Sequence, residues 1–74
     1  MTIYQSIKAN LKADADRAKL ANPTDKPYRR QVINDSANGY HREIDFYAMK
    51  GKFSEAKAEQ YKNWLSSYAA SLHP

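Results

Sequence analysis

Residues 40–68 read YHREIDFYAMKGKFSEAKAEQYKNWLSSY, and this stretch decides the fold. It contains one aromatic-aliphatic-aromatic pattern twice, at identical helical spacing, as Tyr40-Ile44-Tyr47 and Tyr61-Leu65-Tyr68. Since residues three and four apart lie on one face of a helix, each copy forms a single apolar stripe. A short breaker around Gly51 separates the copies, and so short a connection returns the second helix alongside the first. The stretch therefore predicts an antiparallel helical hairpin.

The segment after the breaker carries the clearest helix signals. Ser54 is a good N-cap, and Phe53 and Ala58 occupy the positions of a hydrophobic staple. Apolar residues then step by three and four as in a heptad seam: Ala58, Tyr61, Leu65, Tyr68 and Leu72. The sequence predicts a helix over about residues 54–72.

The segment before the breaker predicts a helix over about residues 25–50. Either Thr24 or Asp25 can cap it, and Pro27 is tolerated in its first turn. Its apolar stripe runs through Tyr28, Val32 or Ile33, Ala37, Tyr40, Ile44 and Tyr47. The pair Asn38-Gly39 allows one continuous helix or two short ones. The stripe keeps its phase across the glycine, which favours the continuous helix.

The N-terminal segment predicts a third amphipathic helix, over about residues 2–21. Thr2 and Gln5 form a capping-box pattern, and Asn22 before Pro23 ends the helix. Its apolar stripe is Ile3, Ile7, Leu11, Ala15 and Ala18, which we expect to cover the groove of the hairpin. The predicted fold class is all-α: one small three-helix domain, residues 1–74, built on the antiparallel hairpin.

Composition restricts the classes of protein further. The 74 residues include no cysteine, which excludes disulfides and thiolate zinc sites. The N-terminus lacks a basic and apolar leader, and no stretch approaches the roughly 20 apolar residues that span a bilayer. We therefore expect a soluble cytoplasmic chain that does not bind membranes. The net charge of +4 comes from 12 basic and 8 acidic residues spread along the chain, with one local basic cluster.

No set of residues carries recognisable catalytic chemistry. His41 and Asp45 share a helical face, but two ligands do not make a metal site. There is no glycine-rich phosphate loop, and the hairpin fails the helix-turn-helix pattern because Tyr47 and Lys57 occupy positions that need a small and an apolar residue. The sequence predicts no enzyme, no metal, no cofactor and no small-molecule substrate.

The leading hypothesis is a protein-interaction module that acts as an inhibitor, adaptor or assembly factor. Aromatic and arginine side chains at the edges of the stripes are typical of protein interfaces. The predicted partner-binding residues are Tyr4, Tyr28, Arg29, Arg30 and Trp64. The hypothesis includes self-association into a homodimer through the tyrosine and tryptophan faces. By size class the chain is similar to accessory proteins of phages and other mobile elements.

The alternative hypothesis is a nucleic-acid-binding protein without sequence preference. A basic cluster beside Tyr28 can contact phosphates and stack on a base. The predicted contacts are Lys26, Arg29, Arg30, Arg42 and Lys50.

Overall fold

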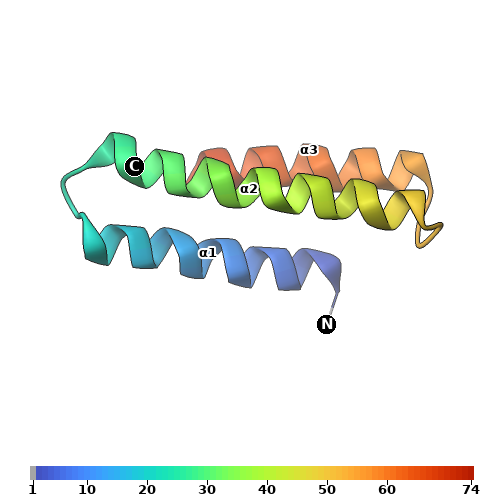
Figure 1. Cartoon of the computed structure of the whole chain (residues 1–74), viewed down its shortest axis with the longest axis horizontal. Coiled ribbons are helices and arrows are strands. Elements are labelled where there is room, and N and C mark those ends of the chain that lie inside the picture. Colours follow the sequence, from blue (N-terminus) through green and yellow to red (C-terminus); the bar gives the residue numbers. More distant parts are fainter. Residues whose placement is uncertain (1) are drawn as a thin grey trace.

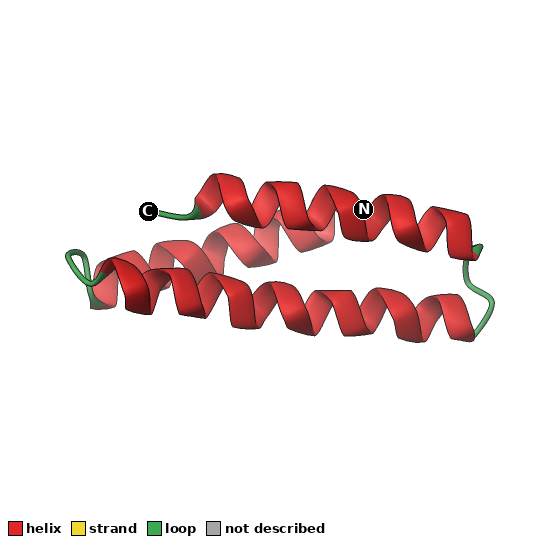
Figure 2. Ribbon diagram, turned by 90° about the horizontal axis from the view of Figure 1, so that it is seen from above, coloured by secondary structure: helices red, strands yellow, loops and turns green. Residues whose placement is uncertain are grey.

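The chain folds into three helices, α1 (Ile3–Ala21), α2 (Lys26–Met49) and α3 (Glu55–Leu72). The computed structural model describes residues 2–74, and within that range it contains no β-strand. Consecutive helices run antiparallel in an elongated bundle of 42 × 22 × 17 Å (Figure 1). Seen from above, α1 lies beneath the α2–α3 hairpin and crosses it obliquely (Figure 2). The predicted all-α three-helix domain is confirmed.

Each helix begins where a side chain can satisfy its first free amide groups. The Thr2 hydroxyl accepts from the Gln5 amide at 3.2 Å, and the Gln5 side chain accepts from the Thr2 amide at 3.0 Å. The Ser54 hydroxyl caps α3. At α2 the cap is Asp25, whose carboxylate accepts from the Tyr28 amide at 3.0 Å. The open choice between Thr24 and Asp25 is thus resolved by a charged acceptor at the positive end of the helix dipole.

The turn between α2 and α3 depends on the backbone of Gly51. This residue has a φ of +79°, in the left-handed region that favours glycine. Its amide bonds to the Ala48 carbonyl, and the Lys52 amide bonds to the Tyr47 carbonyl, both at 3.0 Å. This pair of bonds is the Schellman arrangement, which ends a helix and reverses the chain.

Helix α2 is continuous through Asn38-Gly39, as the phase of its stripe predicts. Buried side chains on both sides of the glycine, Ala37 and Ile44, belong to the same core cluster. Packing on both sides therefore outweighs the cost of about 1 kcal/mol for a glycine inside a helix.

The core consists of a few fully buried aliphatic side chains and the alanines between them. Ile33, and not Val32, points inward. The buried residues are Ile7, Leu11, Ala18, Ile33, Ala37, Ile44, Ala58, Leu65 and Ala69. The four tyrosines of the repeated stripe, Tyr40, Tyr47, Tyr61 and Tyr68, are half-buried at its rim. A phenol ring covers the aliphatic layer while its hydroxyl stays near water, and burial together with the nearby carboxylates of Asp14 and Glu43 raises the pKa of Tyr40.

Tyr28 is the exception to the predicted stripe of α2, because 42% of its surface is exposed. Its ring borders a groove between α1 and α2 beside Ala18 and Ala21. The small side chains at this end of α1 cannot cover a tyrosine, so the ring stays open to solvent.

Side-chain contacts fix the register of the hairpin. Three polar contacts connect α2 with α3 and its C-terminal end, and each step forward along α2, of seven and then four residues, equals the step backward along the partner segment. The contacting pairs are Asn34 with His73 at 2.8 Å, His41 with Ser66 at 3.3 Å, and Asp45 with Lys62 at 2.9 Å. The helices therefore pair antiparallel without a shift along their common length.

Candidate functional site

Five aromatic rings form a cluster that joins α1 to α3. The Tyr4 ring meets Tyr61 edge-on at 4.8 Å and Trp64 at 5.0 Å between centroids. Trp64 stacks on Tyr68 at 5.4 Å with 4° between the planes, and Phe53 lies 5.1 Å from Tyr61. We call these five residues the aromatic cluster, and all of them are half-buried. The structure thus brings the predicted partner-binding residues Tyr4 and Trp64 together, with their ring faces engaged inside the molecule.

Trp64→Ala should therefore lower the free energy of unfolding by about 2–3 kcal/mol, somewhat less than the loss for a fully buried aromatic. Phe46→Ala is the matched control, because 47% of Phe46 is exposed and its removal should cost under about 1 kcal/mol. Urea unfolding followed by far-UV circular dichroism measures the stability of both variants. Tryptophan fluorescence cannot be used, because Trp64→Ala removes the only tryptophan of the chain. Equal losses for the two variants would contradict an internal role for Trp64.

The basic segment at the start of α2 is only partly available for a partner. Arg29 is half-buried, and its Nη1 donates to the Pro23 carbonyl at 2.9 Å, which fastens the α1–α2 connection. Lys26, Tyr28 and Arg30 remain exposed. Of this predicted cluster, Arg29 has a structural contact and the other three are open to solvent.

The predicted nucleic-acid contacts do not form one surface. With a rise of 1.5 Å per residue, Arg42 lies about 24 Å and Lys50 about 36 Å along α2 from Lys26. Lys50 Nζ lies 4.7 Å from the centroid of the Phe46 ring, at the far end of the helix. Likewise Tyr28 lies at the α1–α2 connection, whereas the N-terminal end of α1, which carries Tyr4, lies toward the α2–α3 connection (Figure 1). The predicted residues are therefore spread along the length of the bundle rather than gathered in one place.

One exposed face of α2 carries most of the unprotected apolar surface. The large hydrophobic side chains that stay exposed within residues 2–74 are Leu20 (83%), Tyr28 (42%), Phe46 (47%) and Met49 (80%). Phe46 lies on the side of α2 opposite its buried stripe. Tyr28 and Met49 lie at the edges of that side, where Tyr28 borders the groove with α1 and Met49 borders the groove with α3. We define this outer face by its residues Tyr28, Gln31, Asp35, Asn38, Gly39, Arg42, Phe46 and Met49.

Phe46 and Met49 are candidate functional residues that the sequence analysis missed. The helical periodicity of α2 could have identified them, because positions 46 and 49 point outward when Ile33 and Ile44 point inward. The N-terminus of α1 also stops short of the α2–α3 connection (Figure 1). Two large apolar side chains one helical turn apart are thus left in water.

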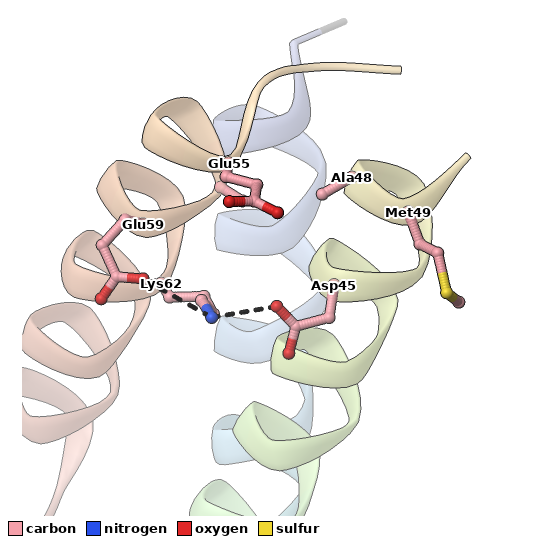
Figure 3. A pocket seen from close by; sticks show the side chains of 7 residues that line it. Asp45, Ala48, Met49, Glu55, Glu59 and Lys62 are labelled. Atoms are coloured by element: carbon pink, nitrogen blue, oxygen red, sulfur yellow. Dashed lines mark ion pairs between the residues drawn. The ribbon is translucent and has the colours of Figure 1, made fainter. Parts of the chain in front are cut away.

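A groove near the α2–α3 connection is lined by acidic side chains around a central lysine (Figure 3). Lys62 Nζ lies 2.9 Å from Asp45 and 3.6 Å from Glu59, while Glu55 lies at the groove's outer end. The hydrogen bond to Asp45 raises the pKa of Lys62. The lysine therefore stays charged and links the two helices through the carboxylates.

The residues considered as metal ligands are occupied elsewhere. His41 contacts Ser66, and Asp45 contacts Lys62. No cluster of three or more histidine, aspartate or glutamate side chains within residues 2–74 has the arrangement of a metal site.

The fold and its surface define the class of this protein as a small all-α three-helix domain with an exposed apolar face on its longest helix. Comparison of the chain with protein-family models, curated proteins and solved structures found no match. Across residues 2–74, none of the helices combines the length and the apolar character needed to cross a bilayer.

Proposed function

We propose that the protein is a non-enzymatic interaction module that binds another protein chain through the outer face of α2. The observation that carries this proposal is the exposure of Tyr28, Phe46 and Met49 on one helix face. Aromatic residues, methionine and arginine are enriched at the centre of protein interfaces, and Arg42 lies between these apolar side chains. Phe46 and Met49 are adjacent at one end of the face, and Tyr28 lies about 27 Å away at the other end, so the face presents two apolar anchors with polar residues between them.

The charges of the outer face favour a protein over a nucleic acid as the partner. Asp35 lies in the middle of the face, where a phosphate backbone would meet a like charge. The cations Lys26 and Lys50 lie at the two ends of α2 rather than forming a continuous stripe along the face. A protein surface of mixed polarity complements this arrangement better.

A capture experiment with a matched control tests the proposal. The wild type, a Phe46→Ser/Met49→Ser double variant and a Leu20→Ser control are immobilised and exposed to native lysate from cells that make the protein. All three substituted positions are exposed, so we expect folding to be unaffected. A protein retained by the wild type and the Leu20→Ser control, and lost with the double variant, supports the proposal.

Two outcomes contradict the proposal. Identical capture by all three chains would remove the outer face from consideration. Salt-sensitive nucleic-acid binding in gel shifts that is lost in Lys26→Ala/Arg30→Ala and kept in the Phe46→Ser/Met49→Ser chain would establish the nucleic-acid hypothesis instead.

A further inference from the structure

The outer face of α2 has the same residue spacing when it is read from either end. Read forward from Tyr28, the face steps by three, four and three residues; read backward from Met49, it steps by the same intervals. The forward series is Tyr28, Gln31, Asp35 and Asn38, and the backward series is Met49, Phe46, Arg42 and Gly39. The midpoint lies between Asn38 and Gly39, near the middle of the helix. In an antiparallel pair with a two-fold axis at this midpoint, each position of the forward series therefore lies opposite the matching position of the backward series on the second copy.

We propose that the outer face binds the same face of a second copy of this chain, with the two α2 helices antiparallel, to form a symmetric dimer. This inference rests on the proposed function, since it names the partner of the same surface. With the two-fold axis between Asn38 and Gly39, Tyr28 of one copy lies opposite Met49 of the other. In the same register, Asp35 of each copy lies opposite Arg42 of the other.

The central charges select this orientation. Asp35 and Arg42 are exposed, and neither takes part in an ion pair within residues 2–74. The antiparallel dimer forms the Asp35–Arg42 pair twice, once on each side of the axis. A parallel dimer would place each of these charges opposite its own copy, and like charges in contact disfavour association.

Gly39 occupies the position where the two helices would approach most closely. A Cβ atom added to it meets no atom within 4 Å in the single chain, so packing inside the domain does not require glycine there. Its helical backbone does not require glycine either, because the only positive φ among the described residues is that of Gly51. Glycine weakens an isolated helix but lets a second helix approach its backbone.

The ends of the contact bury the apolar side chains that the single chain leaves in water. At each end, Tyr28 of one copy meets Met49 of the other, with Phe46 one helical turn away. Methionine sulfur packs favourably against aromatic rings. Paired residues 28–49 extend over about 32 Å of helix. A contact between two single helices of this length belongs to the small interfaces, so we expect micromolar affinity.

Sedimentation equilibrium at protein concentrations from about 1 µM to 1 mM measures the self-association of the wild type and of variants in which a central charge is reversed. Asp35→Arg and Arg42→Asp should each weaken self-association by about 10- to 100-fold, because each places like charges in contact twice. Mixing the two variant chains in equal amounts should restore the dimer mass, since every contact then joins opposite charges. Circular dichroism confirms that each chain is folded. Phe46→Ser/Met49→Ser should be monomeric, and Leu20→Ser should associate like the wild type.

The results separate this inference from the proposed function. A wild type that stays monomeric throughout, or a dimer unaffected by Asp35→Arg, overturns the dimer. A third outcome is that the wild type is monomeric and captures a different protein, whereas Phe46→Ser/Met49→Ser does not capture it. In that case the outer face binds another chain, and only the dimer is overturned. If substitutions on the outer face change neither self-association nor capture, both proposals are overturned.

Discussion

Leu65→Ala should lower the free energy of unfolding by about 3–5 kcal/mol, an effect as large as any expected from truncating a core side chain of this chain. Leu65 is 0% exposed, and it lies in the same aliphatic layer as Leu11 and Ile44, which are also 0% exposed. Truncation removes the buried methyl groups and leaves a cavity that three helices cannot easily close. A domain of 74 residues has a total stability of about 4–11 kcal/mol, so one substitution removes a large part of it.

Leu20→Ala is the matched control, because it deletes the same atoms from a side chain that is 83% exposed. We expect its free energy of unfolding to stay within about 0.5 kcal/mol of the wild type. Urea denaturation followed by far-UV circular dichroism compares the two variants directly. A loss of less than about 1 kcal/mol for Leu65→Ala would contradict the assignment of this layer as the core.

The positions of the helices were predictable because the signals that set them are local. The predicted ranges 2–21, 25–50 and 54–72 differ from the observed ones by at most one residue at either end. Each cap involves a side chain and an amide three residues later, so a short window of sequence contains the whole interaction. The reversal at Gly51 likewise depends on a few neighbouring backbone groups.

The burial of individual side chains was harder to predict, because it depends on all three helices at once. Periodicity gives the direction of a stripe but not how closely a neighbouring helix approaches it. The alanines allow the closest approach, so Ala69 is buried while the adjacent Tyr68 stays at the rim. Tyr28 was placed in the predicted stripe, yet the nearest apolar side chains of α1 in its groove are the small Ala18 and Ala21.

The candidate surfaces depend on contacts between segments far apart in the sequence. Tyr4 and Trp64 are sixty residues apart, and only the oblique crossing of α1 beneath α3 brings their rings together (Figure 2). No local pattern specifies that crossing. The outer face of α2, in contrast, follows from the buried stripe by exclusion, because every helix position that does not face a neighbour faces solvent.

Gly51→Ala and Gly39→Ala should change stability in opposite directions, although each adds one methyl group. At Gly51 the φ of +79° strains any residue with a Cβ, so we expect a loss of about 1 kcal/mol after the reduced entropy of the unfolded chain is included. At Gly39 the backbone is helical and the added Cβ meets nothing within 4 Å, so we expect a gain of about 1 kcal/mol.

Thermal and urea unfolding at low protein concentration measure both glycine variants in the single chain. A loss of stability in Gly39→Ala would show that the domain itself needs this glycine, which would remove one argument for the dimer. A gain of stability together with weaker self-association would show that Gly39 serves contact with a second chain at the expense of the helix. A general loss of folding would lower stability and self-association together. A gain of stability with weaker self-association therefore distinguishes a glycine needed at the interface from one needed by the fold.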